Sequence, residues 1–115
     1  MKIFRRKVKQ GSKTGNKIGY PTINLNIGSF ADHYKSGVYK CEVILDNASY
    51  IGALYFGSKL SHKSATLEIH IIKYNGHIYG QYVRLKVGKQ IRGPKKFTNL
   101  DELKKQIGID LKSIV

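Results

Sequence analysis

The stretch VYKCEVILDNASYIGALYF, residues 38–56, decides the fold class of this chain. Its first half, Val38–Leu45, alternates apolar and polar positions, and a period of two is typical of a half-buried antiparallel strand. Asp46-Asn47 then favours a tight turn into a second strand, Ser49–Phe56. The stretch predicts a β-hairpin whose buried face carries Tyr39, Cys41, Val43 and Leu45.

The same alternation recurs before and after this hairpin. Leu67, Ile69 and Ile71 alternate with Glu68 and His70. Asn75-Gly76 is a strong signal for a type I′ turn, so we expect a further hairpin between the strands that flank it. The predicted strands are Ile3–Gln10, Thr22–Ile27, Val38–Leu45, Ser49–Phe56, Thr66–Tyr74 and Tyr79–Val87.

Only the end of the chain has a helical pattern. Its apolar residues recur at spacings of three and four, which indicates one buried helical stripe. Asn99 followed by Glu102 has the arrangement of a capping box at the start of a helix, and Gly108 is expected to end the first helix. The stripe consists of Leu100, Leu103, Ile107, Leu111 and Ile114. Strands followed by a C-terminal α-helix predict a mainly all-β fold, a small closed β-barrel without exposed edges.

Length and composition bound the function. A chain of 115 residues is expected to form one domain, residues 1–115. The single Cys41 excludes an internal disulfide, and no apolar run approaches a membrane span, so we expect a cytoplasmic protein without a membrane partner. The net charge of +14 attracts polyanions, but an A/T-rich genome produces the same lysine excess, so charge alone identifies no partner.

The segment Gly11–Asn24, GSKTGNKIGYPTIN, is a candidate phosphate site. Glycines allow backbone amides to approach an anion closely, and nearby lysines add positive charge. Thr22 and Asn24 are two residues apart, so on a strand their oxygens share one side and suit a hard cation such as Mg²⁺. The alternative is a mobile loop between two strands. The phosphate-binding candidates are Gly11, Lys13, Gly15, Lys17, Gly19, Pro21, Thr22 and Asn24.

Glu68 is the candidate catalytic acid. It lies in mid-strand on the face opposite the apolar residues, where a carboxylate facing a cleft could accept a proton from a substrate hydroxyl. The alternative is an outward, solvated side chain. Cys41 lies on the apolar face of its strand and is expected in the core rather than at a reactive site.

Taken in order, these segments resemble the riboflavin kinase (flavokinase) family. The similarity runs from about Lys7 to Asp110 and is carried by GSKTGNKIGYPTINL, SGVYKCEV, LEIHI, NGHIYGQYVRLKV and IRGPKKFTNLDELKKQI. The resemblance implies a six-stranded antiparallel Greek-key β-barrel that transfers the γ-phosphoryl group of MgATP to the 5′-hydroxyl of riboflavin, giving FMN. It thus implies riboflavin and ATP as substrates and Mg²⁺ as cofactor. A monomer is expected.

The resemblance also implies roles for individual residues. Thr22 and Asn24 would hold the metal and the nucleotide phosphates, beneath the glycine-rich loop. Glu68 would be the base for the 5′-hydroxyl. The segment after the last strand and the terminal helix would border the flavin, through Arg92, Phe97 and Leu103.

Three features depart from the family pattern. Pro94 replaces the usual acid after Ile-Arg, Ile23 replaces the usual Ala, and Gly57–Lys63 lacks the Pro-Thr that commonly follows the glycine. The family's FMN adenylyltransferase domain is not found in this sequence, so this stand-alone form is not expected to make FAD by itself. The choice among ATP, CTP and GTP cannot be predicted from the sequence.

Two other functions compete with the kinase. One is a basic, non-catalytic β-barrel that binds nucleic acid, and the other is a flavin- or nucleotide-binding regulatory module without kinase activity. The sequence shows no interleaving of exposed aromatic and basic residues on one sheet face, so nucleic acid is not an expected partner.

Overall fold

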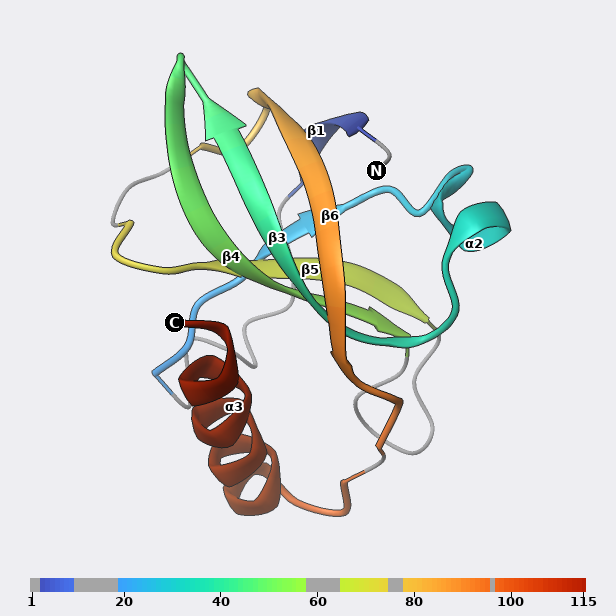
Figure 1. Ribbon diagram of the computed structural model, residues 1–115, viewed down its shortest axis with the longest axis vertical. Coiled ribbons are helices and arrows are strands. Elements are labelled where there is room, and N and C mark those ends of the chain that lie inside the picture. The colour runs from blue at the N-terminus through green and yellow to red at the C-terminus, as the bar shows by residue number, and fades with distance from the viewer. Residues whose placement is uncertain (1–2, 10–18, 58–64, 75–77, 96) are drawn as a thin grey trace.

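The chain forms a closed barrel of antiparallel strands with one long helix packed against its outside (Figure 1). The computed structural model describes residues 3–9, 19–57, 65–74, 78–95 and 97–115. The strands are β1 Ile3–Lys9, β2 Ile23–Leu25, β3 Gly37–Leu45, β4 Ala48–Gly57, β5 Thr66–Ile71 and β6 Tyr82–Arg92. A single helical turn, α2 Phe30–His33, separates β2 from β3, and α3 Leu100–Ile114 ends the chain.

The barrel closes in the strand order β1-β2-β5-β4-β3-β6. Strands β3, β4 and β5 are consecutive neighbours, and β6 returns to lie beside β3, which is the Greek-key arrangement. The predicted hairpin around Asn75-Gly76 is therefore wrong as a strand pairing, because β5 pairs with β2 and β4 whereas β6 pairs with β1 and β3. Residues 75–77 themselves lie outside the described residues.

The hairpin predicted at Asp46-Asn47 is confirmed. Leu45 pairs with Ala48, so the turn contains two residues, and both have positive φ angles, +50° and +66°. Positive φ at both central positions defines a type I′ turn, in which the backbone twist matches that of the flanking strands. The other strand predictions hold with shifted ends: β2 and β5 are shorter than predicted, and β6 begins and ends later.

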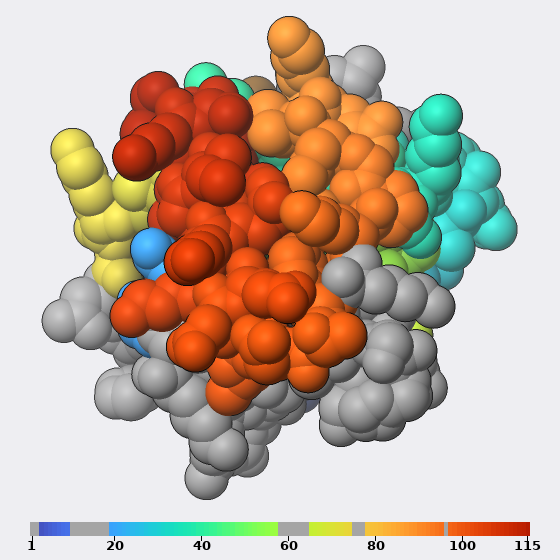
Figure 2. Space-filling model, turned by 90° about the horizontal axis from the view of Figure 1, so that it is seen from below, coloured from blue at the N-terminus to red at the C-terminus, as the bar shows by residue number. Residues whose placement is uncertain are grey.

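Two apolar clusters lie on opposite sides of the barrel wall. The inner cluster fills the barrel and includes Cys41, as predicted, and its fully buried side chains include Leu25, Phe30, Val43, Leu54, Leu67, Ile69 and Leu85. The outer cluster lies between the wall and α3, and its buried members are Val38, Ala53, Tyr55, Phe97, Leu103, Ile107 and Ile114. Helix α3 and the segment leading into it cover much of the face seen in Figure 2.

Helix α3 begins as the sequence predicted but does not end where predicted. The Asn99 side chain accepts a hydrogen bond of 2.9 Å from the backbone N–H of Glu102, which satisfies one of the free amides of the first turn. The helix passes through Gly108 to Ile114. The glycine costs about 1 kcal/mol of helix propensity, and burial of Ile114 beyond it offsets that cost. Neither described helix is long and apolar enough to cross a membrane.

Candidate active site

A row of paired residues crosses the outer surface of the barrel wall beside α3. Directly paired residues in antiparallel strands have side chains on the same face, so the row brings together groups that are far apart in the sequence. Glu68 lies near its centre, between its partners on β2 and β4. From β1 to β6 the successive partners are Lys9, Asn24, Glu68, Tyr55, Val38 and Arg92.

Glu68 faces away from the barrel interior, as its position in the strand predicted, yet only 3% of it is exposed. The solvated alternative is therefore wrong. The Thr22 hydroxyl donates to Oε1 at 2.7 Å, and the Thr66 hydroxyl donates to Oε2 at 2.9 Å. A buried carboxylate requires such donors, because an unpaired charge away from water is costly. The two threonines fix the orientation of the carboxylate, and Thr22 connects it to the end of the glycine-rich segment.

Thr22 and Asn24 alternate with Ile23 and Leu25, which pack into the inner cluster. Their side chains therefore leave the outer side of β2, where Asn24 pairs with Glu68. The Thr22 hydroxyl donates its hydrogen bond to Glu68. The lone pairs of the hydroxyl oxygen therefore point away from Glu68 and suit a hard cation. No cluster of three or more His, Cys, Asp or Glu able to hold a metal occurs in the described part of the chain.

The start of β2 is fixed to β5 by a second contact. The ring nitrogen Nδ1 of His70 lies 2.8 Å from the carbonyl oxygen of Pro21, and because a carbonyl only accepts, Nδ1 donates. Tyr20 packs edge-on against the same imidazole, with ring centroids 5.7 Å apart. Gly19, the residue before Tyr20, has a φ angle of +86°, a backbone conformation that favours glycine. The candidate residues Gly11, Lys13, Gly15 and Lys17 lie outside the described residues.

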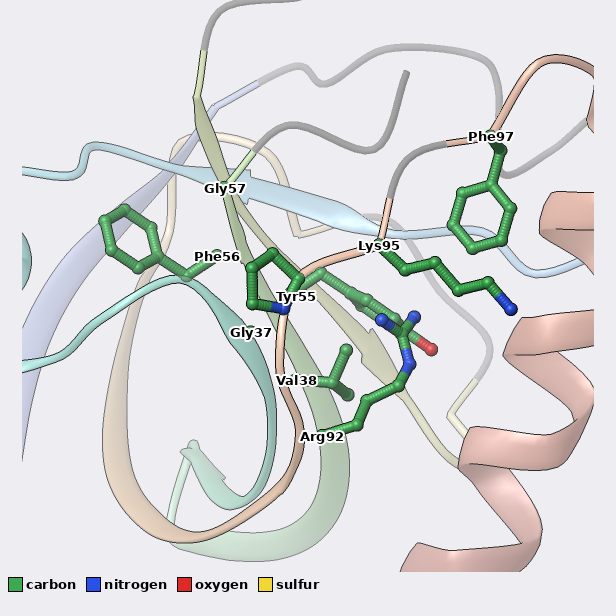
Figure 3. Close-up of a pocket in the computed structure, with 9 residues that line it drawn as sticks. Gly37, Val38, Tyr55, Phe56, Gly57, Arg92, Lys95 and Phe97 are labelled. Carbon is green, nitrogen blue, oxygen red and sulfur yellow. The ribbon is translucent and has the colours of Figure 1, made fainter. Parts of the chain in front are cut away.

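A pocket opens beside this row, where the end of β4 meets the segment after β6 (Figure 3). Tyr55 and Gly57, which line it, pair with Glu68 and Thr66 on the next strand, so the pocket and the carboxylate are neighbours. Its free volume is about 20 Å³, enough for one water molecule. The described lining residues are Gly37, Val38, Tyr55, Phe56, Gly57, Arg92, Pro94, Lys95 and Phe97.

One wall of this pocket is held by a buried ion pair. Arg92 donates from Nε to one oxygen of Asp110 at 2.8 Å and from Nη2 to the other at 3.0 Å. Gln106 also donates to Asp110, at 3.0 Å, and accepts from Lys95 at 3.3 Å. Asp110 is 1% exposed. This network connects α3 to the end of β6 and to the segment that follows it.

Tyr55 lies next to that ion pair. Figure 3 shows the Arg92 side chain reaching toward the hydroxyl end of Tyr55, with Lys95 beside it and Phe56 directed the other way. Burial, followed by the negative charge of Asp110, raises the pKa of the Tyr55 hydroxyl, and the positive charge of Arg92 opposes them more weakly. The phenol therefore remains protonated at neutral pH.

The three residues proposed to border a flavin occupy different positions. Arg92 and Phe97 both line the pocket, although the guanidinium of Arg92 is engaged by Asp110. Leu103 is 1% exposed within the outer cluster and does not line the pocket. Leu103 packs α3 onto the barrel. Gly37 allows the pocket wall to form, since a Cβ there would lie 2.6 Å from the Arg92 carbonyl oxygen.

Sequence reasoning missed Asp110 and Tyr55. A signal for Asp110 was present, because it follows Ile107 by three residues and precedes Ile114 by four, on the buried stripe of α3. A charged residue on such a stripe requires a buried partner of opposite charge. Tyr55 had no comparable signal, because its aromatic neighbours in the sequence suggest only a core strand.

Comparisons with known proteins identify the family of the chain. The family model for riboflavin kinase (Flavokinase) matches residues 3–115. The bifunctional riboflavin kinase/FMN adenylyltransferase of Haemophilus influenzae is 32% identical over 115 residues, covering 97% of this chain and 37% of that protein. The chain spans 16% to 37% of the length of the first curated relatives that it matches.

Two solved structures share the fold. The riboflavin kinase from Trypanosoma brucei superimposes with a TM-score of 0.67 at 25% identity, covering 97% of this chain and 76% of that one. A structure described as a macrolide-efflux protein from Streptococcus pneumoniae has a TM-score of 0.82 at 30% identity, covering 97% of this chain and 38% of that one. On the extent of the family match, this chain belongs to the riboflavin kinase family.

Proposed function

We propose that this chain phosphorylates riboflavin, with ATP as the phosphoryl donor and FMN and ADP as products. The observation that carries the proposal is the Thr22–Glu68 hydrogen bond, because it joins the end of the glycine-rich segment to a buried acid. A phosphate site and a proton acceptor are the two elements that phosphoryl transfer to an alcohol requires. Membership of the riboflavin kinase family supports the choice of substrates.

In this proposal Glu68 accepts the proton of the riboflavin 5′-hydroxyl. The hydroxyl oxygen forms a bond to the γ-phosphorus, and the bond from that phosphorus to the β–γ bridging oxygen breaks, so that ADP leaves. Thr22 and Thr66 hold the carboxylate for this step. Because phosphoryl transfer relies mainly on positioning and charge neutralisation, a fixed carboxylate beside a phosphate cradle supplies what the reaction needs.

The metal proposed at Thr22 and Asn24 is Mg²⁺. A hydroxyl and an amide oxygen suit Mg²⁺, which completes its shell with water and substrate phosphates rather than with a full set of protein ligands. The bound ion would neutralise charge on the transferred phosphoryl group. The direction of the Thr22 hydroxyl proton, toward Glu68, supports this assignment.

The flavin is proposed to bind at the pocket beside Tyr55, against Phe97. The free volume of the pocket between the described residues is about 20 Å³, which is too small for the flavin ring system. Binding therefore requires the segment around Lys95 and Phe97 to move outward. Hydrogen bonds between Lys95, Gln106 and Asp110 connect that segment to α3, which makes the helix part of the flavin site. We further propose a cytoplasmic monomer.

The direct test is to incubate the chain with riboflavin, ATP and Mg²⁺ and to follow FMN by chromatography. We expect FMN with ATP and Mg²⁺ and none when the metal is chelated. Thr22→Ala should lower FMN formation most strongly at limiting Mg²⁺, and added Mg²⁺ should restore part of it. If no FMN forms with ATP, CTP or GTP from a folded chain, the kinase proposal is wrong. The regulatory alternative is then tested by riboflavin binding alone.

A further inference from the structure

The outer face formed by β1, β6 and β3 brings together basic residues that are far apart in the sequence. Strand pairing places Arg5 directly opposite Arg84, and Lys7 opposite Tyr82. Arg84 in turn pairs with Ile44 on β3. These side chains alternate with buried residues such as Phe4, Val83 and Leu85, so they point outward. We call Arg5, Lys7, Tyr82 and Arg84 the basic face.

The charges of the basic face are not neutralised from within the protein. Among the described residues no carboxylate lies within ion-pair distance of Arg5, Lys7 or Arg84, and the ion pairs found there are Lys86–Glu42 and Arg92–Asp110. All seven acidic residues of the chain fall in the described ranges. Like charges placed directly opposite each other on a sheet cost stability. An external anion bound between Arg5 and Arg84 would remove that cost.

The exposed aromatic ring of Tyr82 lies beside these basic side chains. Tyr82 is 50% exposed, and the Arg5 guanidinium carbon lies 3.8 Å from the centre of its ring. Both residues border a hollow of about 330 Å³, whose other lining residues are Ile44, Asp46, Asn47 and Arg84. The carboxylate of Asp46 opposes an anion at one edge, while the amide of Asn47 can form hydrogen bonds beside it.

The basic face contradicts one prediction made from the sequence. No interleaving of aromatic and basic residues on a single sheet face was expected, yet Tyr82 lies between Lys7, Arg5 and Arg84. The pattern is invisible in the linear sequence because Arg5 and Tyr82 are adjacent only through the β1–β6 pairing. That pairing follows from the Greek-key crossover after β5, which replaces the expected hairpin.

We propose that the basic face binds single-stranded nucleic acid, with backbone phosphates at Arg5, Lys7 and Arg84 and an unpaired base against Tyr82. The charges suit any polyanion, but an exposed ring beside a hollow favours a ligand with planar groups that can stack. A paired base cannot offer its face in this way, which favours a single strand over a duplex.

This site is separate from the proposed kinase site. In the six-stranded ring, β6 and β5 lie opposite each other, with two strands between them in either direction. Glu68 on β5 therefore lies on the far side of the barrel from Tyr82 and Arg84. The two functions can be tested independently in the same variants.

The test measures fluorescence anisotropy of a short, labelled oligouridylate with the whole chain, between about 50 and 200 mM salt. Arg5→Gln combined with Arg84→Gln should lower the affinity about tenfold or more and flatten the plot of log affinity against log salt by about 1.4 units, as expected for two phosphate contacts on a single strand. Tyr82→Ser should also lower the affinity about tenfold, with the salt slope unchanged, because stacking releases no counterions.

The matched control is Lys104→Gln combined with Lys105→Gln, which removes the same charge from exposed positions on α3. We expect this control to keep the affinity within about twofold at physiological salt. Circular dichroism should be unchanged in all variants, and FMN formation should be unchanged in the basic-face variants. An equal loss in the control, displacement of the oligonucleotide by polyglutamate or anionic vesicles, or equally tight binding of duplex RNA would overturn the proposal.

Discussion

The barrel face under α3 and the basic face carry similar residues in different surroundings. Each has arginine beside a tyrosine, but Tyr55 is 4% exposed and Tyr82 is 50% exposed. Under the helix, Arg92 is paired with Asp110 at 2.8 Å. On the basic face, Arg5 stacks on Tyr82 with no carboxylate within ion-pair distance among the described residues.

The difference follows from the cost of burying charge. An unpaired charge in a dry environment is expensive, so a buried arginine requires a carboxylate with fitted hydrogen bonds. In water the same arginine needs no partner and remains available to an external anion. The covered face therefore uses its charges to position α3 and the pocket, whereas among the described residues the arginines of the basic face have no carboxylate within ion-pair distance.

The largest expected effect is on the covered side, from Glu68→Gln. The amide keeps the size of the side chain but cannot take a proton from a hydroxyl. General-base catalysis typically contributes about a hundred- to ten-thousand-fold, and a loose transition state favours the lower end. We expect FMN formation to fall by about a hundredfold, with little change in riboflavin affinity. Glu42→Gln, which changes a carboxylate of β3 that does not line the pocket, is the matched control. A rate close to that of the parent chain would remove Glu68 from the mechanism.

The next effect is the loss of the buried ion pair in Asp110→Asn. Removing one partner leaves the half-buried Arg92 without compensation, which typically costs about 3–5 kcal/mol. Since 20% of the Arg92 side chain is exposed, we expect the free energy of unfolding in urea to fall by about 3 kcal/mol, the lower end of that range. The pKa of Tyr55 should also fall, because Asp110 contributes to raising it.

A second variant separates the charge effect from simple loss of packing. Arg92→Met combined with Asp110→Leu removes both charges and keeps apolar bulk under the helix. Replacement of a buried pair by apolar residues is often neutral for stability, so the double variant should recover most of the loss. A double variant as unstable as Asp110→Asn would mean that the shape of the ion pair, not its charge balance, holds α3.

The barrel interior offers a third environment, in which burial acts on a single ionisable group. Burial raises the pKa of the Cys41 thiol from 9.0 to about 12. Above pH 9.0 the unfolded chain loses this proton while the folded chain keeps it, so the unfolded state binds fewer protons and stability falls as the pH rises. Because the unfolded thiol is half ionised at pH 9.0, the loss between pH 9.0 and 10 is about 1 kcal/mol, and the slope approaches about 1.4 kcal/mol per pH unit at higher pH.

Cys41→Ala should remove this contribution, so that between pH 9.0 and 10 the variant loses about 1 kcal/mol less stability than the parent chain; tyrosines titrate in both chains and cancel in the comparison. The measurement is the free energy of unfolding in urea at several pH values in that window. At neutral pH the variant should show only a modest loss from its smaller side chain. A wild-type stability that stays constant across the window would contradict the raised pKa.

Much of the barrel was predictable from the sequence, because the signals involved are local. Alternation along each strand, the Asp46-Asn47 turn and the apolar stripe of α3 depend only on neighbours in the chain. The failures required knowledge of distant pairing. Asn75-Gly76 suggested a hairpin, but β6 lies beside β3, and the end of α3 depends on apolar contacts formed beyond Gly108.

The candidate site likewise contains residues that could be predicted from their local sequence and residues whose partners are distant in the chain. Glu68 could be selected from its position within one strand, and its buried, hydrogen-bonded state agrees with that choice, although its catalytic role remains a prediction. The position of Asp110 on the buried stripe of α3 indicated a buried partner of opposite charge, but that partner, Arg92, lies on β6, so the sequence near either residue does not identify it. The basic face likewise exists only because β1 and β6 meet.

The smallest expected effect comes from Glu42→Gln, at the edge of the basic face. Glu42 lies 3.9 Å from Lys86, its side chain is 42% exposed, and it also accepts a hydrogen bond from Ser49. Exposed pairs of this kind contribute about 0–1 kcal/mol, so the free energy of unfolding should change by less than about 0.5 kcal/mol, far less than for Asp110→Asn. Oligonucleotide affinity should rise about twofold, because Lys86 then adds an unpaired charge next to Arg84. Urea unfolding and the anisotropy titration measure the two quantities separately.

A stability loss as large as that of Asp110→Asn would mean that exposure does not distinguish the two ion pairs. A fall in affinity would count against phosphate binding on this side of the barrel.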